Sequence, residues 1–144
     1  FDEDGYVEAL LRDLDREFST CGGRPLQSVF FGGGTPSLFS ASAIRAVIDH
    51  ARALFSFDDI EITMEANPGT FEQEKFTAFR EAGVNRLSIG IQSFQDQFLQ
   101  ALGRVHDSAE ARHAADNARH AGFDNFNLDL MFGLPGQDRR LASN

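Results

Sequence analysis

The chain has 144 residues, the size of a single domain and enough to bury a hydrophobic core. Its formal net charge of −9 argues against nucleic acid or an acidic membrane as a partner, because no basic patch offsets it. The one cysteine, Cys21, has no disulfide partner within the chain, which fits a reducing cytoplasm. No apolar run reaches membrane-spanning length, and no signal peptide opens the chain.

Both ends of the chain lie close to structured elements. The sequence begins with Phe1 rather than Met, enters a helical pattern almost at once, and stops at Asn144 shortly after a strand-end motif. We therefore interpret residues 1–144 as one partial domain, the middle of a longer protein.

The first part of the chain predicts a helix, a strand and a second helix. Apolar residues at helical spacing indicate a helix over residues 4–18, and Gly22 follows as a stop signal. A strand is predicted over residues 28–31. The next helix begins after Ser40 or Ser42, because either side chain can cap its free N–H groups.

The middle of the chain continues the alternation. A strand is predicted over residues 59–65, and a third helix follows it. Thr70 and Gln73 have the spacing of a capping box at the start of this helix, and Gly83 ends it. The next strand is predicted over residues 86–91.

The last part predicts two helices and a strand. A short helix over residues 95–102 is followed by a longer one over residues 108–121. Asp107 and Glu110 have capping-box spacing for the longer helix. A strand over residues 125–131 completes the pattern.

The strand patterns distinguish two parallel architectures. Repeated strand–helix units favour a barrel or a doubly wound sheet, and a doubly wound sheet needs strands that are apolar on both faces. Here the last three strands each have one apolar and one polar row, so helices can cover only one face. We predict an α/β barrel wall with a wet interior. The alternative is a doubly wound sheet with one poorly covered face. The polar rows are Glu61, Thr63 and Glu65; Arg86, Ser88, Gly90 and Gln92; and Asn125, Asn127 and Asp129.

A glycine-rich turn follows the strand at residues 28–31. Its sequence is Gly32-Gly33-Gly34-Thr35-Pro36, and glycine lets backbone amides approach a ligand closely. It is not a Walker A loop, since no Gly-Lys-Ser/Thr follows, and it lacks the spacing of a dinucleotide fingerprint. The run indicates either a ligand-binding turn or a plain tight turn.

Three later strands end in polar side chains that their hydrophobic patterns do not require. Glu65 can accept from an ammonium or hydroxyl group, and Gln92 and Asp129 can each hold a sugar hydroxyl. Arg104, just after Gly103, can pair with a carboxylate or lie solvated on the surface. Because the carboxyl ends of parallel strands share one rim, these residues together favour a polar small-molecule site. Taken singly, each residue favours a structural role over a functional one; Glu65, for example, can pair with an arginine.

Two other readings of the sequence are disfavoured. His106, His113 and His120 recur every seven residues, but no acidic or cysteine ligand completes a metal site, so we predict none. A phosphate-binding barrel enzyme, such as an aldolase or isomerase, is disfavoured because no lysine ends any predicted strand.

Five motifs, taken in order and spacing, resemble the radical S-adenosylmethionine (SAM) superfamily. More narrowly, they resemble the branch that holds oxygen-independent coproporphyrinogen III oxidase and the haem chaperone HemW. The Leu-Gly-Arg-x-His run and the Gly-Leu-Pro-Gly-Gln ending resemble the chaperone more than the oxidase. The resemblance reaches Gln137 and implies a partial (β/α)6 barrel. The motifs are FGGGTP at 31–36, EANP at 65–68, RLSIGIQSF at 86–94, LGRVH at 102–106 and NLDLMFGLPGQ at 127–137.

The resemblance also implies a SAM-binding role for each motif. In the family, the glycine run meets the amino-acid end of SAM, and a glutamate lies near the ligand. A glutamine and an aspartate contact the ribose, and an arginine binds the carboxylate. In that order, the matching residues are Gly33, Gly34 and Thr35; Glu65; Gln92 and Asp129; and Arg104.

Several family features lie outside the chain. The resemblance implies a Cys-x-x-x-Cys-x-x-Cys loop for a four-iron four-sulfur (4Fe–4S) cluster just before Phe1, and Cys21 cannot replace three thiolates. The family's last barrel strand and C-terminal domain are also absent. We expect the chain by itself to contain no catalytic residue and to have no radical activity, because the cluster supplies the electron that cleaves SAM.

The resemblance implies two functions for the longer protein. One is a haem chaperone that binds haem and delivers it to respiratory proteins. The other is a coproporphyrinogen III oxidase, which decarboxylates porphyrinogen propionates with an adenosyl radical. The partners expected are SAM, haem or a porphyrin, and a haem-acceptor protein.

Overall fold

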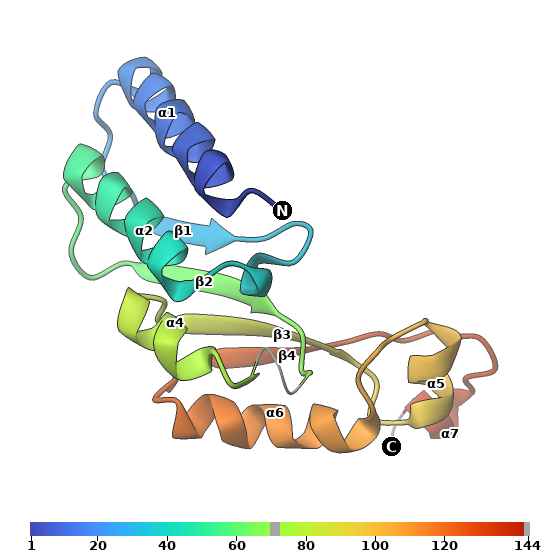
Figure 1. Ribbon diagram of the computed structural model, residues 1–144. Coiled ribbons are helices and arrows are strands. Elements are labelled where there is room, and N and C mark those ends of the chain that lie inside the picture. The colour runs from blue at the N-terminus through green and yellow to red at the C-terminus, as the bar shows by residue number, and fades with distance from the viewer. Residues whose placement is uncertain (70–72, 143–144) are drawn as a thin grey trace.

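A parallel sheet of four strands forms the centre of the computed structural model, which describes residues 1–69 and 73–142. The strands lie in the order of the chain, and all three neighbouring pairs are parallel (Figure 1). This order is that of a barrel wall, whereas a doubly wound sheet reverses its strand order at a switch point. The strands are β1 (Ser28–Phe31), β2 (Glu61–Ala66), β3 (Arg86–Gln92) and β4 (Phe126–Leu130).

The helices that connect the strands lie on one face of this sheet. Figure 1 shows α2, α4 and α6 side by side along that face, and α5 and α7 beyond the carboxyl ends of the strands. The bounds are α1 (Glu3–Cys21), η1 (Pro36–Leu38, a 3-10 turn), α2 (Ala41–Phe55), α4 (Phe76–Ala82), α5 (Asp96–Ala101), α6 (Ser108–His120) and α7 (Arg139–Ala142).

The core lies between the sheet and these helices. Along β3 every second residue is buried, as the alternation in the sequence predicts. The buried residues of β2 and β3 pack with α2, α4 and α6, and the polar row occupies the opposite face. The predicted barrel wall is therefore confirmed, and the doubly wound alternative is wrong. Core residues that carry this packing are Ile48, Met64, Phe76, Phe79, Leu87, Ile89, Ile91 and Ala114.

Helix starts follow the predicted capping chemistry where the structure describes them. Ser40 caps α2, and its Oγ accepts from the N–H of Ala43 at 3.1 Å. Glu3 accepts from the Ser40 hydroxyl at 2.6 Å and from its N–H at 2.8 Å, which holds the pKa of Glu3 below its usual value. The capping box of Asp107 and Glu110 is confirmed. The one predicted at Thr70 lies outside the described residues.

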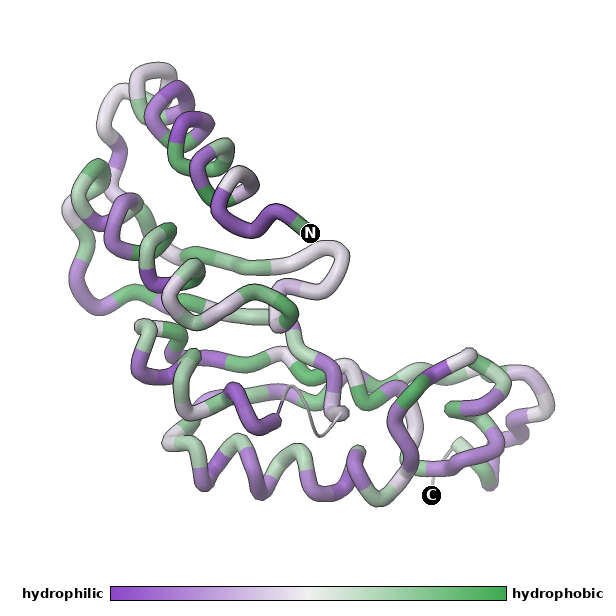
Figure 2. Tube along the Cα trace, viewed as in Figure 1, coloured by the Kyte–Doolittle hydropathy of each residue, from purple (hydrophilic) through white to green (hydrophobic). Residues whose placement is uncertain are grey.

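The two outer regions are less buried than the sequence predicts. None of residues 3–21, all of which the structure describes, is buried, although Leu14 and Phe18 pack against the core. Hydrophilic and hydrophobic stretches alternate along α1 (Figure 2). On β4, Leu130 is 57% exposed despite its place in the apolar row. Both departures have one cause: β1 and β4 are the edge strands, so fewer elements cover them.

No helix within residues 1–69 and 73–142 combines the length and apolar character needed to cross a lipid bilayer.

The Ser40 cap gives a test of the link between α1 and α2. Replacing Ser40 with Ala removes the helix cap and the hydroxyl that donates a hydrogen bond to Glu3. We therefore expect the free energy of unfolding to fall by about 1 kcal/mol. Chemical denaturation monitored by circular dichroism measures this change. Ser28→Ala is the matched control and should cost under about 0.5 kcal/mol, because Ser28 is exposed at the start of β1. Equal losses for the two variants would contradict the assignment.

Candidate ligand site at the carboxyl edge of the sheet

A cleft of about 230 Å³ opens where the strands end. Of the seven residues assigned to ligand binding from the sequence, all but Gly33 line it, and Gly33 contacts one of its walls. These positions therefore lie together at one rim of the sheet, and their role in ligand binding stays a prediction. The lining residues are Gly34, Thr35, Pro36, Glu65, Ala66, Asn67, Ser88, Gly90, Gln92, Arg104 and Asp129.

The glycine turn and Glu65 form one wall of the cleft. The N–H of Gly33 donates to Oε2 of Glu65 at 3.1 Å, across 32 positions of the sequence. Gly33 and Gly34 have φ angles of +76° and +41°, in the left-handed region that favours glycine. At Gly32 a Cβ would lie 2.5 Å from Cε1 of Phe30 and 3.2 Å from the Glu65 carboxyl carbon, so a side chain there would displace the Phe30 ring and crowd this approach. Glu65 therefore holds the turn, and within residues 1–69 and 73–142 it forms no ion pair with an arginine.

Gln92, at the end of β3, and Arg104, in the loop after α5, both lie close to Gly90. A Cβ on Gly90 would lie 3.0 Å from Nε2 of Gln92 and 3.7 Å from Nη2 of Arg104. Both polar side chains therefore lie over Gly90, in space that any other residue would fill. Sequence reasoning missed this role, although Gly90 stands in the same inward row as Gln92, and a glycine in that row was the available signal.

Two side chains, Asn127 and Ser88, donate hydrogen bonds to the Asp129 carboxylate. Its Oδ1 accepts from Nδ2 of Asn127 at 2.6 Å, and its Oδ2 accepts from Oγ of Ser88 at 2.7 Å. Asn127 Nδ2 also donates to Ser88 Oγ at 3.1 Å. Each carboxylate oxygen has a second lone-pair direction, which allows it to accept from a ligand as well. Ser88 was not among the predicted site residues, yet it both orients Asp129 and lines the cleft.

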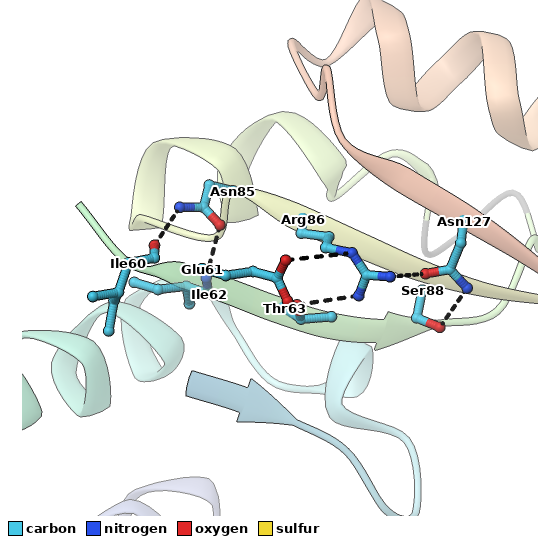
Figure 3. A network of polar contacts seen from close by, with 8 residues as sticks. All are labelled: Ile60, Glu61, Ile62, Thr63, Asn85, Arg86, Ser88 and Asn127. Carbon is cyan, nitrogen blue, oxygen red and sulfur yellow. Dashed lines mark hydrogen bonds and ion pairs between the residues drawn. The ribbon is translucent and has the colours of Figure 1, made fainter. Parts of the chain in front are cut away.

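A polar network continues from Asn127 across the inner face of the sheet (Figure 3). The guanidinium of Arg86 donates to Oδ1 of Asn127 and to Oγ1 of Thr63 at 3.3 Å, and its Nε lies 3.7 Å from Glu61 Oε2. Thr63 Oγ1 in turn donates to Glu61 at 3.0 Å. The polar row of three strands is thus internally satisfied, as a half-buried set of polar groups requires.

The charges of the cleft suit a small ligand that carries several kinds of polar group. In the described part of the chain Arg104 forms no ion pair, so its guanidinium can meet a ligand carboxylate. Asp129, Glu65 and the amide oxygen of Gln92 supply acceptors for hydroxyl or ammonium groups. The turn at Gly34 exposes backbone to the same space.

His113, His120 and Cys21 lie away from the cleft, whereas His106 is buried beside it. His113 and His120 are exposed on α6, and residues 1–69 and 73–142 contain no group of three potential metal ligands. Cys21 is free and exposed at the last residue of α1. That end of α1 lies on the side of the molecule from which β1 starts, away from the carboxyl ends of the strands (Figure 1).

Comparison with known families agrees with this geometry. The family model described as "Radical SAM superfamily" matches residues 2–141. The chain belongs to the radical SAM superfamily. A match of this length covers every strand and the whole cleft, so the superfamily resemblance of the sequence motifs is confirmed.

Similar proteins narrow the comparison. The chain is 50% identical to "Heme chaperone HemW" of Escherichia coli over 135 residues, which cover 93% of this chain and 36% of that protein. It is 49% identical to the protein of the same name from Haemophilus influenzae, over 94% of this chain and 37% of that protein. The chain thus spans little more than a third of the length of these curated relatives. The resemblance to the HemW branch is confirmed.

A solved structure supports the fold. The coproporphyrinogen III oxidase HemN from Escherichia coli, described as a radical SAM enzyme, superposes with a TM-score of 0.84 and 30% identity. The superposition covers 98% of this chain and 33% of that one. An archaeal Elp3 from Methanocaldococcus infernus superposes with a TM-score of 0.63 at 18% identity, which shows the fold alone.

The residues present fit one of the family's two cofactors. The cleft holds a cation for a carboxylate, acceptors for an amine and hydroxyls, and a turn without side chains, which is the donor set that SAM requires. The cluster does not fit these residues, because a 4Fe–4S cluster needs several thiolates and Cys21 is the one cysteine in the sequence.

The polar network gives a test that needs no ligand. Asn127→Ala removes the contacts to Arg86, Ser88 and Asp129, so we expect the free energy of unfolding to fall by about 1–3 kcal/mol. Asn125→Ala, at an exposed position just before the same strand, is the control and should change it by under about 0.5 kcal/mol. Urea denaturation of both variants measures the difference, and a neutral Asn127→Ala variant would show that the network does not stabilise the sheet.

Proposed function

We propose that the cleft binds SAM and that the chain is the SAM-binding part of a haem-handling protein. The observation that carries this proposal is the convergence of Glu65, Gln92, Arg104 and Asp129 on one cleft beside the glycine turn. These residues come from separate strands and loops, so nothing local in the sequence brings them together.

Each side of the cleft takes a different part of the ligand. Arg104 pairs with the SAM carboxylate, and Glu65, already joined to the N–H of Gly33, accepts from the ammonium group. Asp129 and Gln92 accept from the ribose hydroxyls. The backbone of Gly33, Gly34 and Thr35 lies along the amino-acid end of SAM. When bound, SAM supplies a sulfonium-linked adenosyl group for radical chemistry, while the residues of this chain bind and orient it.

The longer protein is proposed to be a haem chaperone. The support is the identity of about half of all residues with two proteins named "Heme chaperone HemW". Haem would be its cargo, and a haem-acceptor protein its partner. We place it in the cytoplasm, where a single unpaired and exposed Cys21 remains reduced.

Coproporphyrinogen III oxidase is the second candidate. It is favoured by the TM-score of 0.84 with HemN, but the identity of 30% is lower than with the HemW proteins. The two candidates share the SAM site, so a test of the site alone does not separate them.

SAM binding tests the assigned roles. Equilibrium dialysis of labelled SAM against the full-length protein should show binding, and Arg104→Leu should weaken it about tenfold to a hundredfold, the cost of a lost charge-assisted contact. Asp129→Asn should weaken it similarly. Asp124→Asn is the matched control, because Asp124 is exposed just before β4, at the opposite edge of the sheet. Unchanged affinity in both cleft variants would refute the site.

Haem titration separates the two candidate functions. A chaperone should bind haem and shift its Soret absorbance, and it should leave coproporphyrinogen III unchanged when supplied with SAM and a reductant. Both are measured on the full-length protein with its cluster reconstituted. Decarboxylation of coproporphyrinogen III without stable haem binding would favour the oxidase and contradict the proposed chaperone.

A further inference from the structure

The backbone at Gln92 is unusual for a strand residue. Its φ is +66°, and in the described part of the chain only Ser56 shares a positive φ among non-glycine residues. Ser56 is an ordinary left-handed helix cap at the end of α2. A non-glycine residue in this region costs about 1–2 kcal/mol and persists only where its surroundings hold it.

A β-bulge accounts for this conformation. In the pairing of β3 with β4, Ile89 lies opposite Leu128 and Gln92 lies opposite Leu130, so one strand has an extra residue. A bulge turns the following side chain in a new direction and is common beside functional sites. Beside this bulge the Gln92 side chain lies over Gly90 and lines the cleft.

Three hydrogen bonds hold the bulge. The Gln92 carbonyl accepts from the N–H of Met131 at 2.9 Å, and the Ile91 carbonyl accepts from the N–H of Ser93 at 2.8 Å. The third comes from His106, whose Nε2 lies 3.0 Å from the same Ile91 carbonyl. Because a carbonyl only accepts, Nε2 must carry the hydrogen. His106 is the one side chain that contributes to this set.

His106 also anchors the segment that carries Arg104. Side-chain exposure alternates along this segment. Arg104 lines the cleft, Val105 is fully exposed, and His106 is only 6% exposed. At its other end the N–H of Arg104 donates to the Leu99 carbonyl at 2.9 Å. Burial of His106 therefore fixes the loop two residues from Arg104 and the strand one residue from Gln92.

We propose that His106 is a positioning residue, whose Nε2–H to the Ile91 carbonyl sets Gln92 and Arg104 in register over Gly90. His106 does not touch the ligand. Its bond joins the strand and the loop that supply two walls of the cleft, so its loss moves both. The proposal rests on the proposed SAM site and adds a residue to which the site itself assigns no role.

Two substitutions separate positioning from simple packing. His106→Phe keeps a buried ring of similar size but loses the donor, whereas His106→Gln places an amide N–H where Nε2 stood. His113→Phe is the matched control, since His113 is exposed on α6, one heptad further along. For each variant of the full-length protein, SAM affinity is measured by equilibrium dialysis and stability by thermal unfolding.

A second readout needs no ligand. Ile91-Gln92 is the one Ile-Gln pair in these 144 residues, so labelling isoleucine carbonyls with ¹³C and glutamine backbone nitrogens with ¹⁵N reports this peptide bond. In the full-length protein its signal is identified by its loss in the Ile91→Val variant. Its carbonyl shift follows the hydrogen bond from His106.

We expect His106→Phe to weaken SAM binding about tenfold and to shift the Ile91 carbonyl signal, and His106→Gln to restore most of both. His113→Phe should change neither. The proposal is overturned if His106→Phe lowers stability but leaves the affinity and the carbonyl signal unchanged. If the unaltered protein binds no SAM, the proposed function fails, while the carbonyl signal still decides whether His106 holds the bulge.

Discussion

The sheet has two chemically different faces, and this difference determines both the core and the cleft. Since helices cover one face, each strand must give alternate residues to the core and to the open side. β3 follows this rule along its whole length, from Leu87 inside the core to Gln92 at the cleft. The polar row is expensive to desolvate unless its members bond to one another, and the network from Glu61 to Asp129 meets that requirement.

The cleft depends on close approaches rather than on any single strong interaction. Gly32 lets the turn reach Glu65, and Gly90 makes room for Gln92 and Arg104. The first of these contacts joins β2 to a turn that lies more than thirty positions earlier in the sequence, so the site exists only when the parallel pairing is complete. Several of its lining residues stand on the paired strands β2, β3 and β4, and a site built on strands keeps its geometry better than one built on loops.

Much of this arrangement could be predicted from patterns of local sequence. The strand at residues 28–31, the cap at Asp107 and the shared rim of polar strand ends all follow from periodicity and capping rules. The bulge at Gln92 could not be predicted, because it arises from the register between two strands. The exposure of Leu130 also escaped the pattern, since alternation does not reveal which strand lies at an edge.

The outer strands have a consequence for handling the protein. Among the residues that the structure describes, only β2 and β3 are paired on both sides, so β1 and β4 each present a line of backbone donors and acceptors along their outer edge. Apolar side chains stand beside them, with Phe30 58% exposed next to one edge and Phe132 89% exposed just past the end of the other. Unpaired strand edges of this kind form backbone hydrogen bonds with strands of other molecules. A preparation limited to these 144 residues should therefore self-associate as its concentration rises.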